Sequence, residues 1–141
     1  MWDSHYGKRM IYYPKINLCF VHIPRTAGRS IKECMFSNLV HRNITWKLPH
    51  MLLKDCIEDL PKDVRIFTVY RNEQDRINSC LKNNWIAEYV PNQNLKLTFN
   101  DYVGDFPYIY IIQFTNLIDD LNLMMKQFKL NINFDKLKKI E

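Results

Sequence analysis

The stretch INLCFVHIPRTAGRSI, residues 16–31, carries the strongest structural signal in the chain. Its first half, Ile16–Ile23, is a compact apolar run that ends at Pro24, which predicts a buried β-strand. Beyond Gly28, apolar residues recur at the spacing of an amphipathic helix: Ile31, Cys34, Met35 and Leu39. The stretch therefore predicts a strand, a short loop and a helix in immediate succession.

The same succession occurs twice more along the chain. Val64–Tyr70 is β-branched and aromatic, and a helix that Asn72 caps is expected after it. Tyr108–Gln113 is the third expected strand, and the helix after it has an apolar stripe at Leu117, Leu121, Met124 and Phe128. Pro49–Leu60 is expected to form a short helix, and residues 41–48 and 90–100 are expected to be irregular.

This alternation predicts a single α/β domain over residues 1–141. We expect three layers, in which helices flank both faces of a short parallel sheet. In such sheets ligands bind at the carboxyl ends of the strands, so the residues after each strand are the candidates for function.

The loop after the first strand has the composition of an anion site. Gly28 allows close approach of the backbone, and the first amides of the following helix favour negative charge. Thr26 and Ser30 add hydroxyl groups, while Arg25 and Arg29 add cations. The alternative is a capped helix with two exposed arginines.

A second cationic cluster follows the second strand. Arg71 stands at the strand end, and Arg76 and Ser79 lie on the helix after it. Guanidinium groups and a hydroxyl suit a phosphate monoester, which carries close to two charges. The alternative for Arg76 is an ion pair on the helix surface with Asp75 or Glu73.

These two segments resemble those of the carbohydrate-type sulfotransferases, which are P-loop-like enzymes. FVHIPRTAGRSI is similar to their phosphosulfate loop, FxHIPKTAGTS, and FTVYRNEQDRINS to their 3′-phosphate motif, FxxVRxPxxRxxS. The later segment, residues 110–120, also resembles the family and supports the fold. The resemblance implies transfer of a sulfuryl group from 3′-phosphoadenosine 5′-phosphosulfate to an acceptor hydroxyl, on a glycan or a small molecule.

The resemblance also implies a role for each matching residue. The 5′-phosphosulfate is expected to contact Arg25, Thr26, Ala27, Gly28, Arg29 and Ser30. The 3′-phosphate is expected to contact Arg71, Arg76 and Ser79. His50 matches a histidine of relatives and is the candidate general base, with Arg25 also catalytic. Arg25 replaces the usual lysine, so charge is retained there with a wider group, and Arg29 replaces the usual threonine.

Two other functions remain open. The chain is short for the family, so a nucleotide-binding module that has lost catalysis is one alternative. The spacing from Cys19 to Arg25 and Thr26 is that of cysteine-dependent phosphatases, but Pro24 has no N–H to offer a phosphate and Cys19 belongs inside a strand. His22, within the loop motif, is expected to be structural.

Composition narrows the partners. The net charge of +5 suits an anionic ligand, but no charge run indicates a nucleic-acid partner. Four cysteines without metal-like spacing indicate reduced thiols and a cytoplasmic protein, with no metal site. No signal peptide or membrane span is recognisable, and oligomeric state cannot be inferred.

Overall fold

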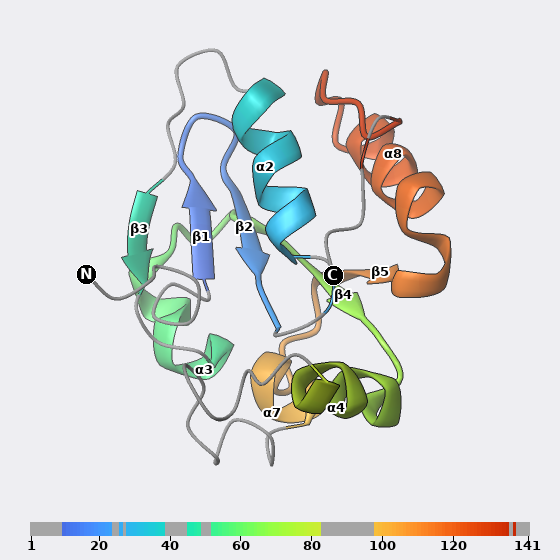
Figure 1. The fold of residues 1–141 in the computed structure, drawn as a ribbon. Helices are drawn as coiled ribbons and strands as arrows, with labels where there is room; N and C mark the ends of the chain where they lie inside the picture. Colours follow the sequence, from blue (N-terminus) through green and yellow to red (C-terminus); the bar gives the residue numbers. More distant parts are fainter. Residues whose placement is uncertain are drawn as a thin grey trace, which may run out of the picture.

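A computed structural model describes residues 10–23, 26, 28–38, 45–48, 52–82, 98–135 and 137. Five strands form one sheet in the order β3-β1-β2-β4-β5 (Figure 1). The strands are β1 (Met10–Tyr13), β2 (Leu18–Val21), β3 (Thr45–Leu48), β4 (Arg65–Tyr70) and β5 (Ile109–Gln113). The helices are α2 (Gly28–Asn38), α3 (Leu53–Cys56), α4 (Glu73–Lys82), α7 (Phe99–Val103) and α8 (Leu117–Gln127), with 3-10 turns η1 (Ile57–Asp59) and η2 (Phe114–Asn116).

The three predicted strand-to-helix units are confirmed. Strands β2, β4 and β5 are parallel neighbours, with Val21 beside Thr68 and Thr68 beside Ile111. Each is followed by its expected helix, α2, α4 or α8, the last reached through η2. The α/β class therefore follows from the local patterns of these segments.

The sheet is mixed, whereas the sequence predicted a parallel one. Strand β1 was not predicted, and it runs antiparallel to both β2 and β3. β3 lies within residues 41–48, which were wrongly expected to be irregular throughout. The hairpin from β1 to β2 turns at Asn17, whose φ of 50° lies in the left-handed region that asparagine tolerates. The Tyr12 hydroxyl donates to Asn17 Oδ1 at 2.9 Å and supports this turn.

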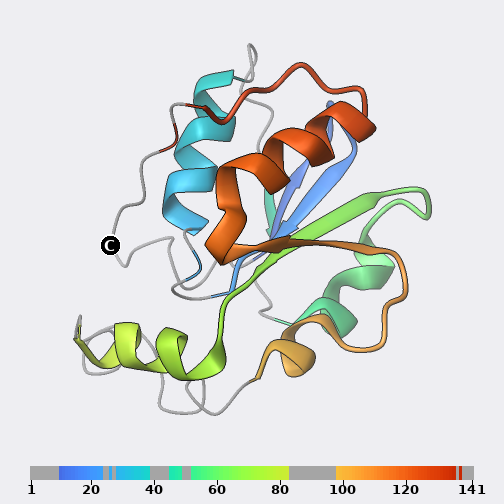
Figure 2. The same cartoon turned by 90° about the vertical axis from the view of Figure 1, so that its right-hand side faces the viewer.

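Two apolar clusters cover opposite faces of the sheet, as alternation along the strands requires. On β4, Phe67 and Val69 pack with α2 and α8, whereas Ile66 packs with α3 and α7. Figure 2 shows α2 and α8 together on one side of the strands, with α3 on the other. The helices and the sheet therefore form three layers, and the expected covering of both faces is present.

Helix α4 departs from that covering role. It extends from the carboxyl end of β4 away from the sheet, close to α7, in both ribbon views. The second predicted helix therefore borders the edge where functional residues were expected.

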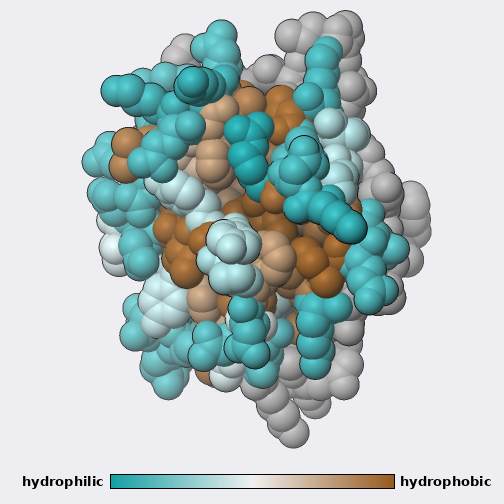
Figure 3. All heavy atoms as spheres, turned by 180° about the vertical axis from the view of Figure 1, so that it is seen from behind, coloured by the Kyte–Doolittle hydropathy of each residue, from teal (hydrophilic) through white to brown (hydrophobic). Residues whose placement is uncertain are grey.

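Part of the second face is left open. Ile111 of β5 shares the strand face of Ile109, which packs with the α3 and α7 cluster, yet Ile111 is 44% exposed. Figure 3 shows apolar side chains gathered near the centre of the rear face, ringed by hydrophilic ones. None of the helices in the described residues is both long and apolar enough to cross a bilayer.

Arg65 is a structural cation at the opposite end of β4 from the candidate site. Its Nη1 donates to the Phe128 carbonyl and its Nη2 to the Ile16 carbonyl, each at 2.9 Å. Its guanidinium also lies 4.7 Å from the centre of the Phe128 ring. These contacts join the end of α8 to the turn between β1 and β2.

Arg65→Met is expected to lower the free energy of unfolding by about 2 kcal/mol, because two charge-assisted hydrogen bonds disappear. Urea denaturation would measure the loss. Lys62→Ala, which removes an exposed cation nearby, should change the unfolding free energy by less than about 0.5 kcal/mol. Equal losses in the two variants would contradict a structural role for Arg65.

Candidate functional site

The candidate site lies where β2, β4 and β5 end. Because Val21 pairs with Thr68 and Tyr70 with Gln113, the segments after these strands leave the sheet at one edge. Figures 1 and 2 agree on what meets there: the first turn of α2, the corner from β5 into η2, and the connection from β4 to α4. The topology therefore brings the described parts of both predicted motifs to the same edge of the sheet.

Between β2 and α2, the structure describes His22, Ile23 and Thr26. Thr26 is fully buried, and its hydroxyl donates to the Ile23 carbonyl at 2.7 Å. Gly28 begins α2, and Ser30 is buried in its first turn. The Thr26 hydroxyl proton is therefore used in a hydrogen bond to the backbone and is not directed at a ligand. Four other predicted groups lie outside the description: Arg25, Ala27, His50 and the side chain of Arg29.

His22 follows directly after β2. It is buried, and its ring stacks on Phe20 with a centroid separation of 5.7 Å. These contacts favour the expected structural role.

Arg71 is positioned by an aromatic ring from η2, directly after β5. Its guanidinium carbon lies 4.3 Å from the centre of the Phe114 ring, at the start of η2, and the side chain is half-buried. A stacked guanidinium presents its N–H groups in its own plane, beyond the edge of the ring. Phe114 therefore limits the directions in which Arg71 can bind an oxyanion.

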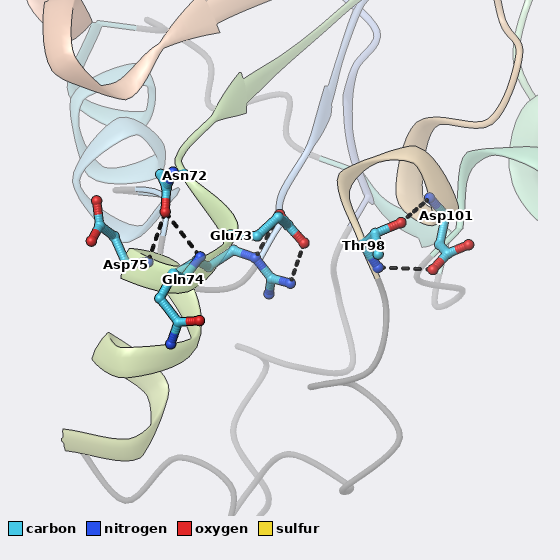
Figure 4. Close-up of polar contacts among 7 residues, drawn as sticks. Asn72, Glu73, Gln74, Asp75, Thr98 and Asp101 are labelled. Carbon is cyan, nitrogen blue, oxygen red and sulfur yellow. Dashed lines mark hydrogen bonds and ion pairs between the residues drawn. The ribbon is translucent and has the colours of Figure 1, made fainter.

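Arg76 is buried, with only 1% of its surface exposed. It forms the ion pair with Glu73 that the sequence left open, at 3.3 Å between Nη2 and Oε2 (Figure 4). Its guanidinium carbon also lies 5.8 Å from the Tyr102 ring centre, on α7. The Arg76 guanidinium thus lies between α4 and α7 and not on a solvated helix face, whereas Glu73 is partly exposed. Ser79, one turn further along α4, is buried as well.

The first amides of α4 already have a partner. Asn72 Oδ1 accepts from the backbone N–H of Gln74 at 3.0 Å and from that of Asp75 at 3.2 Å (Figure 4). This confirms Asn72 as the cap of the helix. An anion at this end of α4 would therefore be bound by side chains. By contrast, α2 begins at Gly28, which allows close approach of the backbone.

Helix α7, which supplies Tyr102, begins with a capping box. Thr98 Oγ1 accepts from the Asp101 N–H, and Asp101 Oδ2 accepts from the Thr98 N–H at 2.8 Å (Figure 4). The hydrogen bond from the Thr98 backbone lowers the pKa of Asp101. The cap is therefore retained at neutral pH and weakens as pH falls through that lowered value.

Two contributors to the site were missed in the sequence. Phe114 belongs to a segment credited only with supporting the fold, and Tyr102 falls beyond a region expected to be a loop. An aromatic directly after a strand was the available signal for Phe114. Tyr102 had none, because its partner Arg76 belongs to another helix.

The described residues can also be compared with two other chemistries, a cysteine nucleophile and a metal site. Cys19 is fully buried in β2, within the α3 and α7 cluster, so its thiol does not face the loop as a phosphatase nucleophile would. Among the described residues, no three His, Cys, Asp or Glu side chains are grouped as metal ligands. In comparisons with known proteins, no protein-family model, curated protein or solved structure matches this chain.

Proposed function

We propose that this chain is a sulfotransferase that uses 3′-phosphoadenosine 5′-phosphosulfate as donor. The observation that carries the proposal is the shared edge of β2 and β4, where a glycine-started helix follows one strand and Arg71 and Arg76 follow the other. A donor with phosphate groups at both ends of its ribose needs two cationic sites side by side. The P-loop-like character of the fold is part of the same proposal.

The cationic cluster after β4 supports this proposal, because its arginines are positively charged and already positioned. Arg71 is oriented by Phe114, and Arg76 is positioned against the Tyr102 ring. Groups that are positioned before a ligand arrives cost less to organise on binding. Together with Ser79, they form the proposed 3′-phosphate site.

The reaction follows from what each group would do. An acceptor hydroxyl oxygen attacks sulfur, a new S–O bond forms, and the bond from sulfur to the 5′-phosphate oxygen breaks. The acceptor proton passes to a base, for which His50 is proposed. The departing 5′-phosphate gains negative charge, and Arg25 and Arg29 would stabilise it together with the first amides of α2. The products are a sulfate ester and 3′-phosphoadenosine 5′-phosphate.

Nucleotide binding tests the proposal first. At about 100 times its Kd, 3′-phosphoadenosine 5′-phosphate is expected to raise Tm by roughly 5–10 °C. ADP has the same number of phosphates but none at the 3′ position, so it should raise Tm by less than about 2 °C, as should AMP. Equal shifts with 3′-phosphoadenosine 5′-phosphate and ADP would exclude the 3′-phosphate site.

Catalysis is tested with isotopically labelled donor and a panel of glycans and phenols, with the product detected by mass. Transfer to any acceptor supports the enzyme. Selective nucleotide binding without transfer would instead favour the catalytically degenerate module.

A further inference from the structure

The inference concerns the counter-ion of the buried Arg76. Its Nη2 and Nε lie 3.3 Å and 3.4 Å from the two carboxylate oxygens of Glu73 (Figure 4). A buried guanidinium requires a nearby negative charge, because leaving it uncompensated is strongly destabilising. Asp75, on the same first turn of α4, is exposed. Glu73 therefore supplies this charge in the present structure.

The carboxylate is not tightly bound. Both contacts are longer than the 2.7–2.9 Å typical of charge-assisted hydrogen bonds. The Glu73 side chain is 34% exposed, whereas that of Arg76 is 1% exposed. One partner of the pair thus has access to water while the other does not.

Release of the carboxylate would leave the start of α4 in place. Asn72 caps the helix through the amides of Gln74 and Asp75, without the Glu73 side chain. Arg76 retains its contact with the Tyr102 ring. The guanidinium therefore stays in position for another anion.

We propose that Glu73 occupies the 3′-phosphate site when no nucleotide is present and is displaced when the phosphate binds Arg76. This inference rests on the proposed function and assigns Glu73 a regulatory role at the 3′-phosphate site. A phosphate monoester brings more charge and more acceptor oxygens than a carboxylate, so it replaces Glu73 favourably. Return of the carboxylate to Arg76 then promotes release of 3′-phosphoadenosine 5′-phosphate, the product that would otherwise remain bound to the enzyme.

Glu73→Gln tests the exchange, with Asp75→Asn as its control. Each removes one acidic charge from the first turn of α4, but only Glu73 contacts Arg76. Calorimetry should show 3′-phosphoadenosine 5′-phosphate binding about tenfold more tightly to Glu73→Gln than to wild type, since no charged contact has to break. Binding of AMP should change less than twofold, and Asp75→Asn should resemble wild type. Equal gains in both variants, or weaker binding by Glu73→Gln, would overturn the exchange.

Melting of Glu73→Gln keeps the test decisive if the variant is unstable. Loss of the counter-ion is expected to lower its Tm, and 3′-phosphoadenosine 5′-phosphate is expected to restore it by replacing the missing charge. A ligand-induced shift no larger than that of wild type would refute the exchange. If wild type prefers 3′-phosphoadenosine 5′-phosphate over ADP, that failure concerns Glu73 alone. If wild type shows no preference, the proposed function and this inference fail together.

Discussion

Arg71→Ala is expected to weaken binding of 3′-phosphoadenosine 5′-phosphate by about 100-fold. The guanidinium stands at the end of β4 on the Phe114 ring, and its removal takes one or two charge-assisted hydrogen bonds from the 3′-phosphate. Such a loss is worth about 3 kcal/mol in binding free energy. Affinity for AMP, which has no 3′-phosphate, should change less than threefold. Calorimetry with both nucleotides measures the difference.

Lys82→Ala is the matched control for that experiment. Lys82 is exposed at the other end of α4, so its removal takes one positive charge away without touching the proposed site. It should alter affinity only through the overall field, by less than about threefold at physiological salt. If Lys82→Ala and Arg71→Ala weaken binding equally, the nucleotide is held by general charge and the 3′-phosphate site is wrong.

Phe67→Ala is expected to lower the free energy of unfolding by about 3–5 kcal/mol. Phe67 and Phe20 are fully buried on the paired strands β4 and β2, and their rings stack with centroids 4.7 Å apart. The substitution removes this contact and leaves a cavity beneath α2. A domain of this size is typically stable by only about 5–15 kcal/mol, so much of that margin would disappear.

Urea denaturation of Phe67→Ala and Leu123→Ala measures the effect. Leu123 on α8 is 50% exposed, so its truncation should cost less than about 1 kcal/mol. A loss below about 1 kcal/mol in Phe67→Ala would mean that the stacked pair is not at the centre of the core.

Much of the fold could be predicted because strand and helix periodicities are local. Apolar runs located β2, β4 and β5, and the recurring stripes located α2 and α8. β1, β3 and α7 were missed because they are short and, unlike β2 and β5, do not begin one of the strand-to-helix units that the apolar stripes mark. These omitted strands are also the ones that make the sheet mixed.

The candidate site was predictable in outline for a similar reason. Loops after parallel strands leave the sheet at one edge, so the alternation of strands and helices was enough to predict that the start of α2 and the connection from β4 to α4 lie at the same edge. The environment of each side chain was not predictable. The Thr26 hydroxyl was expected to face a ligand, but it closes its own turn on the Ile23 carbonyl.

The amino-acid sequence alone therefore determined the three strand-to-helix units, which residues follow their strands, and that Asn72 caps α4. Only the tertiary structure decided that Arg76 is buried against Tyr102 and that Arg71 stacks on Phe114. The physical reason is distance along the chain. Periodicity and capping act between neighbouring residues, whereas burial and stacking depend on partners that only packing of the whole domain brings into contact.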